Sequence, residues 1–222
     1  MRALFEMARA EKSAVVFIDE IDSLCSARGS GDESESSKRI KTEFLVQMQG
    51  VDKDNKGVLI LGATNFPENI DPAIRRRFEK RIEITLPEWV ARKQILKHSM
   101  LKTQTNIKPE DLDSELDQLE KITDKFSASD ISVVMKDAVM MPIRELQKCE
   151  WFVERDGQIH MSNPNEPGAK QGRLMDQDGS KVAVPPVTLE HIKLAIQTCK
   201  KTVGPKDIAR INAFTEQYGQ EG

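Results

Sequence analysis

The chain has 222 residues, and its 33 Lys and Arg residues against 36 Asp and Glu residues give a formal net charge of −3. Hydrophobic residues make up 38% and charged residues 31% of the chain, a balance that is typical of globular proteins and excludes an intrinsically disordered chain. No run of about 18 apolar residues is present, so a membrane-spanning helix is excluded, and the near-neutral charge argues against a general nucleic-acid clamp.

The length of the chain limits the number of domains, and its cysteines indicate the cellular compartment. At roughly 100 to 200 residues per domain, the chain can form one large or two small domains with a real core. Its three cysteines, Cys25, Cys149 and Cys199, are odd in number and far apart, which favours a reducing, intracellular compartment over a disulfide framework. Residues 1–12 predict an amphipathic helix that runs into a strand, and not a signal peptide.

Two apolar runs predict neighbouring strands of a parallel α/β sheet. Residues 13–18 are apolar and end in Asp19 and Glu20, and residues 58–65 are a second run that ends in Asn65. Consecutive apolar residues suit strands that are covered on both faces, and a helical pattern at residues 38–49 lies between them. Because such sheets place ligand crevices at the carboxyl ends of their strands, the polar residues there mark a candidate site.

A short helix and a third strand are predicted next. Asp71 can cap a helix that has Pro72 at its first position, and this helix ends in the arginine run 75–77. Apolar and polar residues alternate over 82–86, which predicts a strand that ends before Pro87.

After Pro87 the strand pattern is replaced by helical windows at residues 90–101, 109–124, 129–149, 189–200 and 205–218. Pro142 is expected to kink or break the third of these helices. The last helix has Ile211, Phe214 and Tyr218 on one face and is expected to fold back on the large domain.

Between the helical windows lies a segment of different composition. Residues 150–187 are rich in Gly, Pro and Asn, and a hairpin is predicted around Asp178-Gly179, joining residues 173–175 to 181–184. The predicted domains are therefore residues 1–87, the C-terminal part of an α/β domain, and residues 88–222, a helical domain with a β insertion at about 151–187.

The strand ends carry the chemistry of the candidate site. Mg²⁺ prefers oxygen ligands, and phosphoryl transfer also needs a group that orients or deprotonates water, so Asp19 and Glu20 could fill both roles. The Asn65 amide could hydrogen-bond the attacking water. Residues 75–77 cannot all face one phosphate, so at least one arginine is expected to be structural; alternatively, the run only stabilises a helix C-terminus.

These motifs together resemble those of the AAA ATPases, with VVFIDEID as a Walker B motif and GATN followed by IDPAIRRRF as the second region of homology. The resemblance implies a partial P-loop NTPase-type parallel sheet with helices, followed by a helical small domain with a β-hairpin insertion. It implies ATP and Mg²⁺ as cofactors, with Asp19 holding Mg²⁺ through water and Glu20 polarising the attacking water. Asn65 would be sensor 1, and Arg76 and Arg77 would be arginine fingers that serve the neighbouring subunit.

The resemblance also implies two further sets of residues. Ser127, Ala128 and Asp130 would lie next to the nucleotide base, although Ala128 stands where relatives commonly have Gly. The second set would form pore loop 2, which contacts a translocating polypeptide, and comprises Arg28, Gly29, Glu33 and Glu35. A Gly/Ser/acidic run of this kind can also be only a solvated connector.

Within this family the chain most resembles the meiotic clade, and in it the Vps-four type vacuolar protein sorting ATPases, also called SKD1-like. The stretches FIDEIDSL, KRIKTEFLVQMQGV, AIRRRFEKRI and INAFTEQYGQEG carry this resemblance. It implies an ATP-dependent remodeller that forms a hexameric ring and extracts ESCRT-III subunits. Such a protein is cytoplasmic and peripheral on endosomal membranes, and binds an activator of the Vta-one/LIP-five type, here expected at the β insertion.

Departures from the family pattern leave alternatives open. The printed sequence contains no glycine-rich loop ending in GK[ST], so the chain is expected to begin inside the helix before Walker B and to be inactive alone. One alternative is a microtubule-severing ATPase of the katanin or spastin type, which would require the insertion to be irregular loop. The other is a non-catalytic interaction module. The basic run 75–81 has one interleaved aromatic residue, which does not favour nucleic-acid binding.

Overall fold

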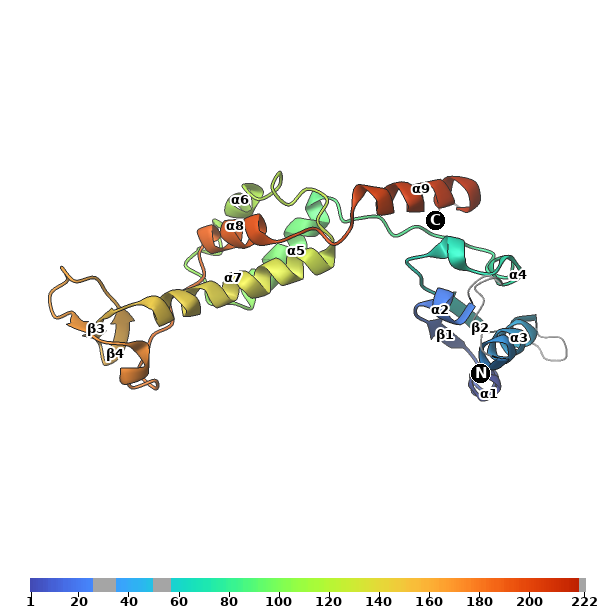
Figure 1. Cartoon of the computed structure of the whole chain (residues 1–222), viewed down its shortest axis with the longest axis horizontal. Coiled ribbons are helices and arrows are strands. Elements are labelled where there is room, and N and C mark those ends of the chain that lie inside the picture. Colours follow the sequence, from blue (N-terminus) through green and yellow to red (C-terminus); the bar gives the residue numbers. More distant parts are fainter. Residues whose placement is uncertain (26–34, 50–56, 220–222) are drawn as a thin grey trace. The chain divides into compact units, whose positions relative to one another are not determined.

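The structure, a computed structural model, describes residues 1–25, 35–49 and 57–219. The chain forms two compact units: the first comprises Met1–Ile84 together with Pro205–Gly222, and the second comprises Thr85–Gly204. Figure 1 shows their helices and strands in chain order from blue to red. In the part of the chain described, no helix has both the length and the apolar character needed to cross a membrane.

The first unit is built around two parallel strands, β1 (Ala14–Ile18) and β2 (Val58–Gly62), which pair with Ala14 opposite Val58 and Ile18 opposite Gly62. This confirms the predicted parallel α/β arrangement. Helices α1 (Arg2–Ala10), α2 (Ile21–Cys25) and α3 (Glu35–Gln49) pack around them, and η1 (Pro67–Asn69) and α4 (Pro72–Arg75) follow β2. The buried core includes Phe5, Val16, Ile18, Ile21, Phe44 and Ile74.

Only one face of the two-stranded sheet is covered among the described residues. Val16 and Ile18 are 5% and 8% exposed, whereas Val15 and Phe17, on the opposite face, are 64% and 58% exposed. Leu59 and Leu61 of β2 share this uncovered face, since they are paired with Val15 and Phe17. The prediction that both faces are covered is therefore wrong for the described residues.

The third predicted strand, at residues 82–86, is also wrong. This segment has no regular secondary structure, and Ile84 is 95% exposed. A strand needs a hydrogen-bonded neighbour, and in the described structure β1 and β2 pair only with each other. Alternation of apolar and polar residues is therefore not sufficient here.

The second unit is a helical domain of α5 (Trp89–Leu101), α6 (Leu112–Asp117), α7 (Ala128–Lys148) and α8 (Leu189–Thr198). Its core is formed by apolar residues of all four helices, among them Leu96, Leu116, Ile131, Ala138 and Ile192. The predicted helix 109–124 is shorter in the structure, because residues 118–125 form turns. Helix α7 is continuous through Pro142, so the expected break does not occur.

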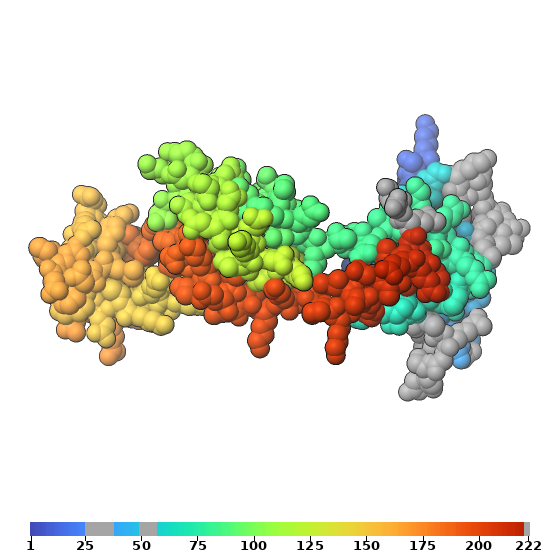
Figure 2. Space-filling view, turned by 90° about the horizontal axis from the view of Figure 1, so that it is seen from above, coloured from blue at the N-terminus to red at the C-terminus, as the bar shows by residue number. Residues whose placement is uncertain are grey.

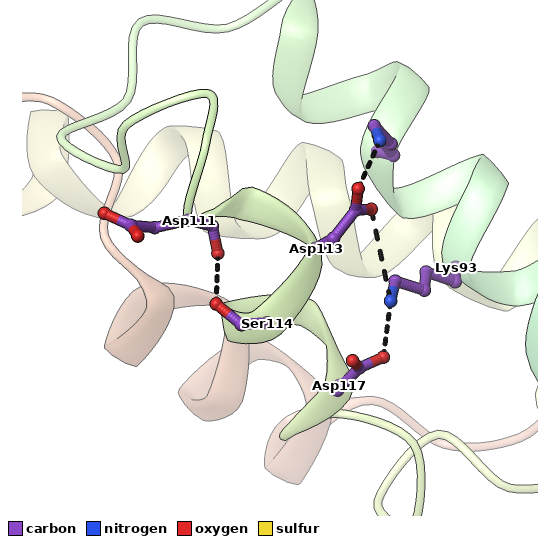
Figure 3. Close-up of polar contacts among 6 residues, drawn as sticks. Lys93, Asp111, Asp113, Ser114 and Asp117 are labelled. Atoms are coloured by element: carbon purple, nitrogen blue, oxygen red, sulfur yellow. Dashed lines mark hydrogen bonds and ion pairs between the residues drawn. The ribbon is translucent and has the colours of Figure 1, made fainter.

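Ion pairs join α5 to α6 on the surface of this unit. Lys93 Nζ lies 2.5 Å from Asp117 Oδ1 and 4.0 Å from Asp113 Oδ1, and Lys97 Nζ lies 2.7 Å from Asp113 Oδ2. Figure 3 shows Lys93 reaching both aspartates of α6. Ser114 Oγ donates to Asp111 O at the start of the same helix (2.8 Å). These contacts are exposed, so each stabilises the unit only modestly.

The insertion is a small antiparallel sheet whose position differs from the prediction. Strands β3 (Trp151–Arg155) and β4 (Gln158–Met161) form a hairpin, and β5 (Lys170–Gln171) pairs with the other side of β3. Residues 173–184, where the hairpin was predicted, contain η2 (Leu174–Asp176), a turn and an isolated bridge between Val182 and Ile159. The insertion is therefore β structure, but the predicted hairpin at 173–184 is wrong.

The C-terminal helix α9 (Pro205–Tyr218) is grouped with the first unit, whereas the predicted boundary at residue 88 placed it in the helical domain. Figure 2 shows this red helix along the blue-green surface of the segment that contains η1 and α4. The predicted folding back of this helix on the large domain agrees with that placement. Side-chain contacts to residues 65–81, described below, are the physical reason.

Candidate functional site

The carboxyl ends of β1 and β2 continue to pair beyond the two strands. The Ala63 N–H donates to Ile18 O (2.9 Å), and the Ile21 N–H donates to Ala63 O (3.0 Å). Because Ile18 is opposite Gly62, the residues that follow each strand lie at one edge of the sheet. The backbone therefore brings Asp19 and Glu20 to the same edge as residues 63–65.

Glu20 has a strained backbone conformation at this edge. Its φ is 48°, in the left-handed region that residues other than glycine seldom adopt. Its N–H donates to Asp19 Oδ1 (2.9 Å), and its carbonyl accepts from the Ser23 N–H (2.9 Å). Strain of this kind costs on the order of 1–3 kcal/mol and is concentrated at functional sites. The side chains of Asp19 and Glu20 are both exposed.

A polar link between the two strand ends was not identified from the sequence. Thr64 Oγ1 donates to Asp22 Oδ1 and accepts from the Phe66 N–H, the latter at 2.9 Å. This link fixes the backbone on both sides of Asn65, whose side chain is exposed. Asp22 belongs to the acidic group after β1 and Thr64 to the GATN motif, but their pairing depends on the register of the strands.

The three consecutive arginines have different environments. The Arg75 guanidinium lies over the rings of Tyr218 (4.0 Å to the centroid) and Phe214 (5.8 Å). Arg77 Nη1 donates to Ala73 O of its own helix. Arg76 is exposed, and its side chain makes no hydrogen bond or ion pair within the described ranges. At least one structural arginine was expected, and Arg75 fits that description.

Two arginines, one on each side of the contact, join helix α9 to residues 65–81 of this unit. Arg81 Nη1 donates to Tyr218 O (2.8 Å), and its Nη2 donates to Arg75 O (3.4 Å). Arg210, from α9, donates through Nη1 to Asn65 O (3.1 Å) and forms an ion pair with Glu68. The contacts of Arg81 with Tyr218 and of Arg210 with Asn65 could not be assigned from the sequence, because the partners are more than a hundred residues apart.

The other predicted nucleotide-binding residues lie in the second unit, at the N-terminus of α7. Ser127 and Asp130 form a capping box, in which Ser127 Oγ accepts from the Asp130 N–H (3.0 Å) and Asp130 Oδ2 accepts from the Ser127 N–H (2.9 Å). Asp130 Oδ1 also accepts from the Thr202 N–H (3.1 Å). Ala128, the first residue of α7, is exposed.

The Asp130 carboxylate is 1% exposed, and both of its oxygens accept hydrogen bonds. Burial acts to raise the pKa of Asp130, but the hydrogen bonds from Ser127 and Thr202 outweigh burial, and the pKa ends below its ordinary value of 3.8. Asp130 therefore remains ionised and holds the chain before α9 against the start of α7.

The predicted pore loop 2 lies largely outside the described residues. Arg28, Gly29 and Glu33 fall in the undescribed range 26–34, and Glu35 is the first residue of α3. Their role stays a prediction.

The donors at the sheet edge are chemically suited to Mg²⁺. One Asp19 oxygen accepts the Glu20 N–H, and the other has no hydrogen-bond partner in the part of the chain that the structure describes. A single exposed carboxylate oxygen suits a metal that usually keeps several of its waters. No group of three or more His, Cys, Asp or Glu side chains arranged to hold a metal occurs among the described residues.

Comparisons with known proteins give a consistent result. Residues 1–86 match the family model described as "ATPase family associated with various cellular activities (AAA)", and residues 161–219 match the "Vps4 C terminal oligomerisation domain". Vacuolar protein sorting-associated protein 4B of Mus musculus is 42% identical over 234 residues, which cover 100% of this chain and 52% of that protein.

Two further relatives are more distant. Katanin p60 ATPase-containing subunit A1 of Strongylocentrotus purpuratus is 38% identical over 225 residues, which cover 99% of this chain and 39% of that protein. The crystal structure of the FIGL-1 AAA domain in complex with ADP has a TM-score of 0.74 and 33% identity, covering 99% of this chain and 63% of that one. The chain spans about half the length of the curated vacuolar sorting relatives that it matches.

Proposed function

The chain belongs to the AAA ATPase family, and from that premise we propose that it carries the hydrolytic residues of an ATP-dependent remodelling ATPase that disassembles ESCRT-III polymers in endosomal and vacuolar sorting. The observation that carries the proposal is the shared sheet edge, where strained Glu20, Asp19 and the turn at Asn65 come together. The sorting assignment is supported by the 42% identity to a vacuolar protein sorting-associated protein.

The residues at the edge divide the work of ATP hydrolysis. Asp19 would hold Mg²⁺ through water, and the metal would neutralise charge on the phosphates of ATP. Glu20 presents an exposed carboxylate next to Asp19, so it can accept a proton from the attacking water or polarise it. Asn65, from the adjacent strand end, can orient the same water by a hydrogen bond.

The arginines would act on a neighbouring copy. Arg76 is exposed, and its side chain makes no hydrogen bond or ion pair in the described part of the chain, so it is available to reach another subunit. Arg77, which bonds to its own helix, would have to release Ala73 O to do so. An arginine supplied in trans stabilises transition-state charge only in the assembly, which couples hydrolysis to a hexameric ring. The match to an oligomerisation domain supports self-association.

The second unit would contribute the base-binding region and a partner surface. Ser127 and Ala128 begin α7 and would lie next to the nucleotide base, with Asp130 holding their turn. The small sheet of β3, β4 and β5 is our candidate for the Vta-one/LIP-five type activator. We place the protein in the cytoplasm and on endosomal membranes through its partners, with pore loop 2 at residues 28–35 contacting the substrate polypeptide.

A microtubule-severing ATPase is the second candidate, because a katanin subunit is 38% identical. That alternative requires the insertion to be irregular loop, and the three-stranded sheet within residues 151–171 counts against it. A non-catalytic interaction module is a third reading, which activity measurements distinguish from the other two.

The test compares ATP hydrolysis by the 222-residue chain and by the same chain fused behind the N-terminal half of mouse vacuolar protein sorting-associated protein 4B, which is to supply a phosphate-binding loop. Glu20→Gln is made in both, because it keeps the shape of the side chain and removes the basic carboxylate. We expect hydrolysis only in the fusion, and a loss of at least about 100-fold with Glu20→Gln.

Binding of ATP is measured in parallel with a fluorescent analogue. The Glu20→Gln fusion should bind ATP as tightly as the unchanged fusion and accumulate rings in size-exclusion chromatography. Turnover near that of the unchanged fusion would remove Glu20 from the mechanism. A fusion that binds no ATP would favour the interaction module.

A further inference from the structure

We propose that Arg210 of the C-terminal helix is a positioning residue for Asn65, so that α9 sets the geometry of the sheet edge. The proposal rests on the function proposed above for Asn65. Arg210 lies 145 positions after Asn65 in the sequence, and its side chain joins α9 to the turn after β2.

Arg210 makes three kinds of contact with one short segment, in addition to an ion pair between its Nη2 and Asp207 Oδ1 of its own helix (3.7 Å). Its Nη1 donates to Asn65 O (3.1 Å), the same nitrogen pairs with the Glu68 carboxylate, and its guanidinium lies over the Phe66 ring (4.7 Å to the centroid). The Arg210 side chain is only 30% exposed. A planar guanidinium that donates a hydrogen bond, forms an ion pair and stacks on a ring at the same time fixes the orientation of the turn as well as its distance from α9. A lysine ammonium, which is not planar, cannot do this.

The Asn65 side chain depends on its backbone for its direction. It is exposed, and none of its side-chain atoms forms a hydrogen bond within the described residues. The Phe66 N–H is held by Thr64 Oγ1 (2.9 Å), and Thr64 is held by Asp22, so the turn is anchored on the strand side. Arg210 anchors the carbonyl of Asn65 itself, and it does so from outside the segment 1–84.

The far end of α9 is docked as well, so Arg210 is presented by a fixed helix. Tyr218 stacks on Arg75 at 4.0 Å, and its carbonyl accepts from Arg81 (2.8 Å). The same helix thus contacts the turn that carries Asn65 and also Arg75 of α4, the helix that Arg76 caps at its C-terminus. A catalytic group must be held within about 0.5 Å of its productive position, so loosening this contact should slow hydrolysis more than it weakens ATP binding.

The first measurement uses the 222-residue chain and needs no activity. We expect Arg210→Ala to speed amide hydrogen exchange at Phe66 and Asn69 about tenfold, because the charge-assisted hydrogen bond that holds the Asn65 carbonyl is lost. Arg210→Lys should give an intermediate exchange rate, since it keeps the positive charge but not the planar guanidinium. Lys206→Ala removes a positive charge from an exposed position of the same helix and is the matched control.

The second measurement uses the fusion described above. Arg210→Ala should lower kcat about tenfold and change KM less than twofold, with partial recovery in Arg210→Lys and no change in Lys206→Ala. Unchanged exchange at residues 65–69 in Arg210→Ala would overturn the proposal, as would faster exchange with an unchanged kcat. An inactive unchanged fusion would count against the proposed function, while the exchange result would still decide whether Arg210 holds the turn.

Discussion

Asp130 is a buried aspartate whose two carboxylate oxygens accept hydrogen bonds from the backbone N–H groups of Ser127 and Thr202, and this makes its charge a source of stability. Its pKa is lowered in the folded unit, so between that pKa and the ordinary value of 3.8 the unfolded chain binds more protons than the folded one. The stabilisation is therefore complete above pH 5 or so and is lost as the pH falls through the folded pKa.

We expect Asp130→Asn to lower the free energy of unfolding of the second unit by about 1–3 kcal/mol at pH 7, because the amide cannot accept with both ends. The loss should shrink as the pH falls below the ordinary value of 3.8. Urea unfolding followed by Trp89 and Trp151 fluorescence across this range measures it. Asp124→Asn, at an exposed position, is the control and should behave like the unchanged chain.

At the residue scale, positions that follow from local patterns could be predicted from the sequence, and contacts between distant residues could not. The pairing of Asp19, Glu20 and Asn65 at one edge could be predicted, because apolar strands and the polar residues after them are local patterns. Which of the arginines 75–77 is structural could not, because Arg75 is distinguished by rings at positions 214 and 218. The left-handed backbone of Glu20 has no sequence signal either, since glutamate shows no preference for it.

The hairpin of the insertion shows how one signal can occur twice. Asp156-Gly157 and Asp178-Gly179 are both typical hairpin turns, and the prediction considers only the second. The first is the turn in the structure, with φ of 52° and 76° at its two residues. The stretch before it, Trp151–Arg155, begins with three strand-forming residues, whereas the stretches around Asp178 are largely polar, so side-chain composition decides between equal turns.

Replacing Gly157 or Gly179 with alanine tests whether the first turn and not the second forms the hairpin. Gly157→Ala places a side chain at φ 76°, so the free energy of unfolding of the second unit should fall by about 1–2 kcal/mol. Gly179→Ala should change it by less than about 0.5 kcal/mol, because its φ lies outside the left-handed region and no atom is within 4 Å of the added carbon. Equal losses in urea titrations of the two variants would contradict this account of the hairpin.

The prediction of a third strand is wrong because strand formation also depends on a neighbouring strand, which no local sequence pattern specifies. Alternation at residues 82–86 is the correct pattern for a strand, but pairing needs a free edge of another strand in the right place. The same limit explains the sheet face that carries Val15, Phe17, Leu59 and Leu61. A run of apolar residues predicts cover on both faces, and the described residues cover one of them.

At the scale of the whole molecule, the first unit is made from two distant parts of the chain. We expect a chain that ends at residue 204 to lose protection from hydrogen exchange at residues 65–81 and to be destabilised in this unit by about 2 kcal/mol. The contacts of Arg75 and Arg81 with α9, and that of Arg210 with Asn65, are removed in this chain.

Protection in the second unit should be unchanged in this truncated chain, except next to Thr202. A chain that ends at residue 219 keeps all of α9 and serves as the control. Loss of protection in the control, or retained protection at residues 65–81 in the shorter chain, would show that α9 does not stabilise the first unit.

The division of the chain into two units also sets the order in which the units can fold during translation. The second unit, Thr85–Gly204, lies wholly inside the sequence of the first, so all of its residues emerge from the ribosome before those of α9. Domains usually fold as they leave the ribosome, N-terminal ones first. Here the order is reversed: the first unit begins before the second but is completed after it, and until residues 205–218 have emerged the turn at Asn65 has no Arg210 to hold it.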